Sequence, residues 1–142
     1  MTSSSEIEAY FAKNTAFMGC YSIDNLPLRV KQFPTSLIIN TDPTTEPGDH
    51  WVAVYMTKTK CFYFDSFGLG IIDKSIIDFL KQFYKKVTIN NECIQHYNSD
   101  KCGLYCIAFI NKVKSKNTYN QFISNFNFVH LLDNDKIVLS LL

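Results

Sequence analysis

The sequence predicts an α+β domain, because aromatic and β-branched strand segments stand beside helical segments that are segregated from them along the chain. The chain has 142 residues, of which 46% are hydrophobic and 19% charged. A chain of this length forms one domain that buries enough apolar surface to fold without disulfide bonds. We therefore expect one domain over 1–142, with a disordered tail at 1–5 and a central mixed or antiparallel sheet around a hairpin at 50–67, flanked by helices.

The N-terminal segments predict a helix, a loop and a strand. Ser5 followed by Glu8 fits a capping box, which predicts a short helix over 6–13. The next segment, 19–34, contains a glycine and two prolines and is expected to be mostly loop. The apolar sequence SLIIN at 36–40 then predicts a buried strand.

A β-hairpin is the strongest prediction in the middle of the chain. Segments 50–56 and 61–67 are both aromatic and β-branched, and the polar sequence TKTK separates them. The preceding segment, 41–49, is rich in proline and acidic residues and is expected to be an exposed loop. After the hairpin, 71–86 has the apolar spacing of an amphipathic helix, and 87–90 predicts a short strand.

The C-terminal part predicts helices only. An apolar helix is expected over 102–113, with Ser99 or Asp100 as its N-cap. From residue 118 onward we expect two more short helices, the second of which begins near 133–135.

The composition excludes several classes of protein. The net charge of +1 is too small for a constitutive nucleic-acid binder. No apolar run approaches the roughly 18 residues of a membrane span, and the first residues do not form a secretory signal. We therefore expect a protein that is not secreted and does not act at a membrane. The high content of Lys, Asn and Ile over Arg indicates AT-rich coding and hints at a viral, mobile-element or protist source.

The cysteine count bears on the chemistry of the chain. Five cysteines, an odd number, do not suggest a disulfide framework in a chain of this size, so a reducing compartment is the simpler inference. At least one thiol is then available for chemistry rather than for structure.

The predicted hairpin brings a histidine and an aspartate together. If Thr57 pairs with Lys60 across a two-residue turn, Asp65 lies opposite Val52 and becomes a diagonal neighbour of His50 on the same face. Diagonal neighbours are about 7 to 8 Å apart at Cα, within reach of a long side chain. A carboxylate in this position can orient an imidazole and stabilise the imidazolium that forms when the imidazole acts as a general base.

A second group of residues supplies a nucleophile. Cys102 is expected in the first turn of an apolar helix, where the backbone N–H groups and a nearby imidazolium favour the thiolate. Gly103 leaves space for a substrate carbonyl. Gln95, seven residues before Cys102, can donate an amide N–H to an oxyanion, with the backbone N–H of Cys102 as the second donor.

These residues, in this order, resemble the adenovirus maturation protease (adenain) family. The sequences IDNLP, NTDP, GDHWVA, FDSFG and CGLYC, within about residues 17–110, carry the resemblance. It is nearest to the versions encoded by virophages and by Polinton (Maverick) DNA elements. The proteases that process SUMO-like modifiers share the same order of histidine, aspartate, glutamine and cysteine.

The resemblance implies an α+β cysteine-protease fold and a role for each site residue. It implies that Cys102 is the nucleophile, His50 the general base, Asp65 its orienter and Gln95 the oxyanion donor. Adenain has a glutamate where this chain has Asp65. The resemblance also implies that Trp51 walls the active site. The expected substrates are polypeptides, in particular capsid precursor proteins, with small residues, often glycine, before the scissile bond.

The resemblance further implies where and with what the protein acts. We expect a monomer that works during virion maturation, in the virion and in the host cytoplasm or nucleus. Adenain is activated by a capsid-derived peptide and by DNA, but this chain is shorter and only weakly basic, so no peptide, DNA or metal cofactor is carried over. Nucleic acid is at most a weak partner.

Three alternatives stay open at this point. The first is a zinc cluster, whose ligand spacing is matched by Cys93, His96, Cys102 and Cys106. A zinc site of this kind would give His50 and Asp65 no role. A catalytically dead interaction module on the same fold is a second alternative. The third is enzymatic: an isopeptidase that removes ubiquitin-like or SUMO-like modifiers from other proteins.

Overall fold

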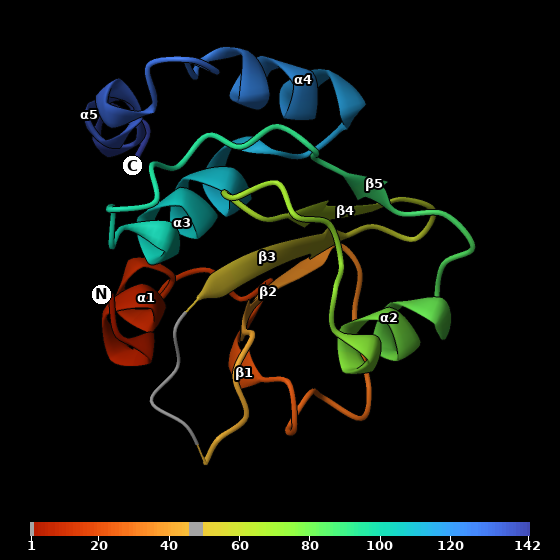
Figure 1. Ribbon diagram of the computed structural model, residues 1–142. Helices are drawn as coiled ribbons and strands as arrows, with labels where there is room; N and C mark the ends of the chain where they lie inside the picture. The colour runs from red at the N-terminus through yellow and green to blue at the C-terminus, as the bar shows by residue number, and fades with distance from the viewer. Residues whose placement is uncertain (1, 46–49) are drawn as a thin grey trace.

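The computed structural model describes residues 2–45 and 50–142, and its centre is one mixed sheet (Figure 1). The strands follow one another across the sheet in chain order, and they are β1 (Phe17–Ser22), β2 (Thr35–Asn40), β3 (Trp51–Met56), β4 (Cys61–Phe64) and β5 (Thr88–Ile89). The pairs β2–β3 and β3–β4 are antiparallel, whereas β1–β2 and β4–β5 are parallel. This arrangement confirms the predicted α+β class.

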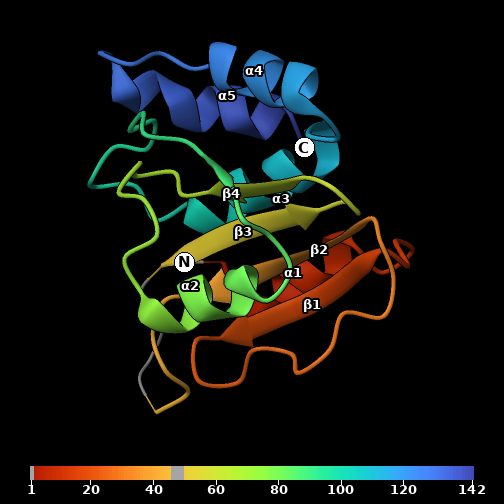
Figure 2. The same cartoon turned by 90° about the vertical axis from the view of Figure 1, so that its right-hand side faces the viewer.

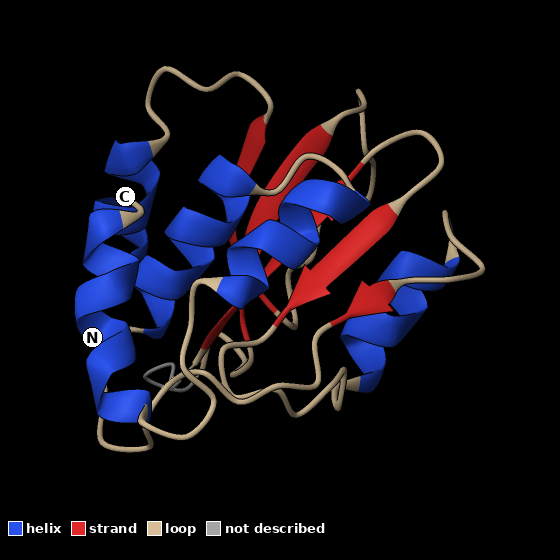
Figure 3. Cartoon of the chain, turned by 90° about the horizontal axis from the view of Figure 1, so that it is seen from above, coloured by secondary structure: helices blue, strands red, loops and turns tan. Residues whose placement is uncertain are grey.

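Helices cover both faces of the sheet (Figure 3). They are α1 (Ser4–Tyr10), α2 (Lys74–Lys81), α3 (Cys102–Lys112), α4 (Lys116–Ser124) and α5 (Asn134–Ser140), with a 3-10 turn at Leu131–Asp133. Figure 2 shows α2 in front of the strands and α3 behind them. No helix in the described ranges has both the length and the apolar character that a membrane span requires.

Alternate residues of the strands enter two different hydrophobic cores. In β3, Ala53 and Tyr55 pack with α3 and α4, whereas Val52 and Val54 pack with α2. Because side chains alternate across a strand, a sheet that is covered on both faces needs apolar residues at nearly every position. This explains why β3 is a continuous apolar run, buried from its first residue to its last.

Helix α3 is the centre of the larger core. Eight of its residues are buried, as expected for a helix that is apolar on nearly all sides. Phe109 of α3 stacks on Phe64 of β4 with ring centroids 4.9 Å apart, and Phe122 of α4 meets the same ring edge-on. Helix α3, which begins with Cys102, is therefore packed against the sheet along most of its length.

The predicted hairpin register is correct. Met56 pairs with Cys61, Ala53 pairs with Phe64, and the Thr57 N–H donates to the Lys60 carbonyl at 2.8 Å. The turn therefore contains two residues, as the side-chain pattern required. The preceding loop is described only over 41–45, where it forms bends and a turn, and the rest of the predicted loop, 46–49, lies outside the described residues.

The prediction for the first helix and the tail was wrong in its boundaries. The helix is capped by Ser3, whose hydroxyl accepts from the Glu6 N–H while the Glu6 carboxylate accepts from the Ser3 N–H. Both Ser3 and Ser5 are followed by glutamate three residues later, and the structure uses the first pair. Residues 2–5, expected in a disordered tail, are therefore placed by the cap and by the helix.

The segment 19–34 was expected to be mostly loop, but its first residues belong to strand β1. The register between β1 and β2 shifts between Phe17 and Cys20, and Gly19 in this bulge has φ +134°. Glycine adopts this backbone conformation without the steric cost that a Cβ would impose. Gly19, which suggested a loop in the sequence, therefore lies in a bulge of the edge strand β1.

Two further boundaries differ from the sequence prediction. Helix α2 covers only Lys74–Lys81 of the expected 71–86, because Asp73 caps it by accepting from the Ser75 N–H. Helix α3 has Lys101 as its N-cap residue instead of the expected Ser99 or Asp100, and the Ser99 hydroxyl accepts from the Lys101 N–H. The two short C-terminal helices are present as expected, α4 beginning at Lys116 and α5 at Asn134.

Candidate active site

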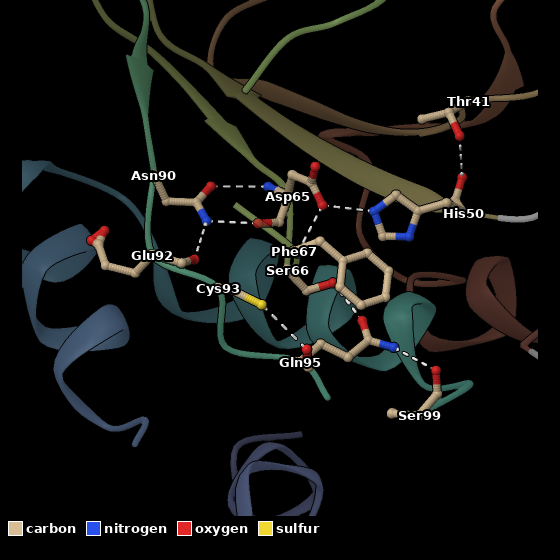
Figure 4. A network of polar contacts seen from close by, with 10 residues as sticks. All are labelled: Thr41, His50, Asp65, Ser66, Phe67, Asn90, Glu92, Cys93, Gln95 and Ser99. Atoms are coloured by element: carbon tan, nitrogen blue, oxygen red, sulfur yellow. Dashed lines mark hydrogen bonds and ion pairs between the residues drawn. The ribbon is translucent and has the colours of Figure 1, made fainter. Parts of the chain in front are cut away.

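The hairpin brings His50 and Asp65 into direct contact. His50 immediately precedes β3, Asp65 immediately follows β4, and the imidazole Nε2 lies 2.6 Å from the carboxylate Oδ1 (Figure 4). The same Oδ1 accepts from the Phe67 N–H at 2.9 Å, and the Phe67 ring lies against the imidazole with centroids 4.8 Å apart. The diagonal neighbour relationship predicted from the sequence is thus present in the structure.

The charge state of His50 reflects both of its reactive neighbours. Burial by itself lowers the pKa of His50, but interactions with the side chains of Asp65 and Cys102 raise it to about 9. The Cys102 thiol therefore lies beside the ring. Nδ1 is buried and has no hydrogen-bond partner of ordinary geometry among the described residues. Because Nε2 is committed to Asp65, Nδ1 is the nitrogen left to exchange a proton with the thiol.

Cys102 is the first residue of α3 and is only 3% exposed. The N-cap residue of this helix, Lys101, makes no capping hydrogen bond with its side chain. The backbone N–H groups of the first turn, with the positive end of the helix dipole, favour an anion at this position. Cys102 therefore stands at the positive end of a helix, next to an imidazole that can accept a proton from its thiol.

Gln95 is 1% exposed, and its amide is fixed at both ends. Its Oε1 accepts from the Ser66 hydroxyl at 2.5 Å, and its Nε2 donates to the Ser99 carbonyl at 2.9 Å (Figure 4). The Ser66 carbonyl also accepts from the Gln95 and Ile94 N–H groups. A primary amide has two N–H donors, so one remains for a developing oxyanion.

Two residues that support the site were missed by the sequence analysis. Ser66 orients Gln95, and Asn90, at the end of β5, bonds to the backbone of Asp65. A serine after an aspartate and an asparagine after a short apolar strand are both common patterns. Nothing in the sequence indicated that these side chains are buried and paired with residues 25 to 29 positions away along the chain.

Trp51 and Gly103 both lie against the N-terminal segment. Trp51 is buried, and its indole N–H donates to the Thr2 carbonyl at 2.9 Å. A Cβ on Gly103 would be only 2.8 Å from the Cβ of Thr2 and 3.3 Å from the Cδ1 of Ile7. The glycine thus allows the N-terminal segment to approach α3 closely, and the substrate contacts expected for both residues stay a prediction.

The proposed zinc ligands are not brought together. Cys106 is completely buried in α3, whereas Cys93 is exposed on the loop before it. His96 stacks on Tyr97 and accepts from the Asn98 N–H. Across residues 2–45 and 50–142, no group of three or more His, Cys, Asp or Glu side chains could hold a metal ion.

A pocket of about 430 Å³ opens beside the histidine and aspartate. Phe67, Leu69 and Ile72 contribute apolar surface to it, and Leu69 and Ile72 are largely exposed. An open apolar pocket beside reactive groups is a common form of ligand site. The pocket is lined in part by His50, whose imidazole also lies beside the Cys102 thiol.

A thiol at a helix start, an imidazole held by a carboxylate, and an amide donor are together typical of the cysteine proteases. The family model described as adenovirus endoprotease (Peptidase_C5) matches residues 17–137. The chain belongs to this family of viral cysteine proteases.

Individual relatives agree with the family model. A thiol protease of Acanthamoeba polyphaga mimivirus is 35% identical over 100 residues, which are 62% of this chain and 32% of that protein. The protease of ovine adenovirus D serotype 7 is 28% identical over 129 residues, 77% of this chain and 63% of that protein. The protease of bovine adenovirus C serotype 10 is 32% identical over 97 residues, 56% of this chain and 48% of that protein.

The chain thus spans between about a third and two thirds of the length of these relatives. Among solved structures, a crystal structure of an ASFV protease is similar with a TM-score of 0.44 and 23% identity, covering 65% of this chain and 39% of that one.

Proposed function

We propose that this chain is a cysteine endopeptidase in which Cys102 is the nucleophile, His50 the general base and Asp65 the residue that orients His50. The observation that carries the proposal is the 2.6 Å contact between His50 and Asp65 beside the buried Cys102 thiol. Membership of a viral cysteine protease family supports it.

The proposed reaction has two steps. The Cys102 thiolate attacks the carbonyl carbon of the scissile bond, the C–N bond breaks, and the amine leaves with the proton carried by His50. This gives a thioester on Cys102. A water molecule then loses a proton to His50 and attacks the thioester, the C–S bond breaks, and the carboxylic acid leaves. The tetrahedral oxyanion formed in each step accepts from the Gln95 amide and the Cys102 backbone N–H.

The burial of the nucleophile supports a preference for slender substrates. Because Cys102 is only 3% exposed, a peptide with small residues, such as glycine, before the scissile bond reaches the thiol with the least displacement of the site. We propose that larger apolar side chains of the substrate occupy the pocket beside Leu69 and Ile72.

The proposed biological substrates are capsid precursor proteins of a virus or virus-like element, cleaved during virion maturation in the virion and in the host cytoplasm or nucleus. Viral relatives named proteases support this proposal. We further propose that the enzyme acts as a monomer without a metal or organic cofactor, because thiol, imidazole and amide supply the nucleophile, the base and the oxyanion donor.

The test is incubation of the wild-type protein and the Cys102→Ala variant with the capsid proteins encoded beside it, followed by mapping of new termini by mass spectrometry. Cys20→Ala, a half-buried cysteine in strand β1, is the matched control. We expect cleavage after small residues by wild type and Cys20→Ala only. Release of an intact modifier protein would favour the isopeptidase alternative. Cleavage by Cys102→Ala, or a stoichiometric metal whose removal abolishes activity, would overturn the proposal.

A further inference from the structure

The loop that carries Gln95 is held from outside the site by the first turn of α5. The fully buried Asn134 donates through Nδ2 to the carbonyl of Ile94, the residue before Gln95, at 2.7 Å. The same amide group donates to the Asn127 carbonyl and accepts from the Asn127 N–H, at 2.7 and 2.8 Å. Asn134 thus fixes the backbone immediately before the oxyanion donor.

The next residue of α5, Asp135, connects the loop to the nucleophile helix. Its Oδ1 accepts from the Ser99 hydroxyl at 3.0 Å and from the Tyr105 hydroxyl at 2.9 Å. Ser99 is the residue whose carbonyl accepts from the Gln95 side chain. Tyr105 lies in α3, three residues after Cys102. Asp135 Oδ1 therefore links Ser99, which binds the Gln95 side chain, to helix α3, which begins with Cys102.

The Tyr105 hydroxyl of this bridge stays protonated and so remains a donor to Asp135. Burial, and then the hydrogen bond with Asp135, raise the pKa of the Tyr105 phenol well above its usual value. Hydrogen bonds to an ionised acceptor are roughly twice as strong as those between neutral groups.

We propose that Asn134 and Asp135 are positioning residues that set the distance between the Gln95 amide and the Cys102 backbone N–H, and so complete the oxyanion site. This inference rests on the proposed function. An oxyanion donor must lie about 2.7 to 3.1 Å from the developing charge. A misplacement of about 1 Å costs roughly 100-fold in rate, so a loop held only by its own backbone would be a poor support.

A purely structural role for Asp135 would give a different experimental result from a positioning role. If the bridge only anchors α5, its loss lowers stability and affects every reaction of Cys102 alike. If it positions Gln95, only reactions that pass through a tetrahedral oxyanion are affected. Alkylation of the thiol by iodoacetamide forms no oxyanion, whereas a peptide aldehyde forms a tetrahedral adduct and peptide cleavage passes through one.

The experiment compares wild type with Asp135→Ala and Asp135→Asn, and with Asp133→Ala, an exposed acidic residue two positions earlier, as control. We measure kcat and KM on a glycine-containing peptide, the inhibition constant of a peptide aldehyde, and the rate of alkylation of Cys102. For Asp135→Ala we expect kcat and aldehyde affinity to fall by about 10-fold to 100-fold, with KM and alkylation rate nearly unchanged. Asp135→Asn keeps an acceptor oxygen and should lie between Asp135→Ala and wild type, and Asp133→Ala should match wild type.

Two milder variants keep the test valid if Asp135→Ala does not fold. Ser99→Ala removes the bond on the loop side while its carbonyl stays available to Gln95, and Tyr105→Phe removes the bond on the α3 side. Each should show the same selective loss of kcat, by a smaller factor. In a Gln95→Ala background, Ser99→Ala should have almost no further effect, because both changes act on one donor.

Two results would overturn the inference: variants with unchanged kcat and aldehyde affinity, or an equal loss in alkylation and cleavage. Failure of the proposed function gives a separate result. In that case the wild-type protein does not cleave peptides, and Cys102 is alkylated no faster than Cys20.

Discussion

The side-chain amide of Asn90 binds both backbone polar groups of Asp65. Its Oδ1 accepts from the Asp65 N–H at 2.9 Å, and its Nδ2 donates to the Asp65 carbonyl at 2.6 Å. The same Nδ2 also reaches the Glu92 carbonyl at 3.3 Å. Both Asn90 and Asp65 are buried. Asp65, the proposed orienter of His50, is thus held by the residue that directly follows β5 as well as by its own hairpin.

Asn90→Ala should therefore reduce both stability and activity. The change leaves buried backbone groups of Asp65 without partners, and each unsatisfied group costs about 1 to 3 kcal/mol. We expect a decrease of ~2 to 4 kcal/mol in the free energy of unfolding, measured in urea, together with a lower kcat. Asn91→Ala, at the exposed neighbouring position, is the control and should change neither quantity. Equal stability of the two variants would contradict this account of Asp65.

Asp65→Asn should leave residual activity, whereas Cys102→Ala and His50→Ala should be nearly inactive. An amide can accept a hydrogen bond from His50 but does not stabilise its charged form. We expect kcat to fall by roughly 10²-fold to 10⁴-fold, less than for loss of the nucleophile. Asp78→Asn, on the exposed side of α2, should retain wild-type kcat. A wild-type rate for Asp65→Asn would show that the contact with His50 is not used in the reaction.

The raised pKa of His50 predicts how stability depends on pH. The folded protein binds the imidazole proton more tightly than the unfolded chain, because the pKa is about 9 instead of 6.5. The resulting stabilisation is fully present below about pH 6.5 and is lost as the pH rises through about 9. Unfolding in urea between about pH 6 and pH 10 should show the difference between wild type and His50→Gln shrinking across this window. A difference that is constant with pH would refute the raised pKa.

The turn after Asp65 offers a matched pair of glycine substitutions. Gly68 and Gly70 both have positive φ, +68° and +76°. A Cβ on Gly68 would lie 2.6 Å from the Glu92 carbonyl oxygen, whereas a Cβ on Gly70 would have no atom within 4 Å. Gly70→Ala should therefore cost only the conformational strain of about 1 to 2 kcal/mol.

Gly68→Ala adds a clash with backbone that leads directly to Gln95. We expect a loss of ~3 kcal/mol or more, because the backbone of Glu92 and Cys93 must move to make room for the added Cβ. Thermal unfolding of both variants measures the difference. Equal melting temperatures would mean that the close approach of the two loops is not maintained in solution.

The register of the hairpin and the place of Cys102 were predictable because both depend on short-range rules. A two-residue turn fixes which residues of 50–67 face each other, and an apolar helix that begins at Cys102 fixes the thiol at its start. The hydrogen-bond partners of Asn134 and Asp135, in contrast, could not be predicted from the sequence. Asn134 lies 40 residues from Ile94, and Asp135 lies 36 residues from Ser99. These partners depend on how α5 packs against the rest of the domain. The local pattern of apolar and polar residues does not predict that packing.

The boundaries that were predicted wrongly have equally specific reasons. Ser3 with Glu6 and Ser5 with Glu8 satisfy the capping-box pattern equally well, and the choice of Ser3 accompanies the packing of Thr2 on Trp51. Strand β1 contains a bulge at Gly19 and is only half-buried, so neither strict alternation nor a continuous apolar run indicated it.

The contact of Thr2 with Trp51 and Gly103 has a practical consequence for producing the enzyme. Thr2 lies next to the residues that directly follow His50 and Cys102 in the chain, so a segment fused ahead of it starts beside the proposed catalytic groups. An affinity tag at that end is expected to compete for space with the proposed substrate, whereas one attached after α5 follows Leu142, which is 37% exposed. Measurements on this enzyme are therefore best made with a C-terminal tag or with none.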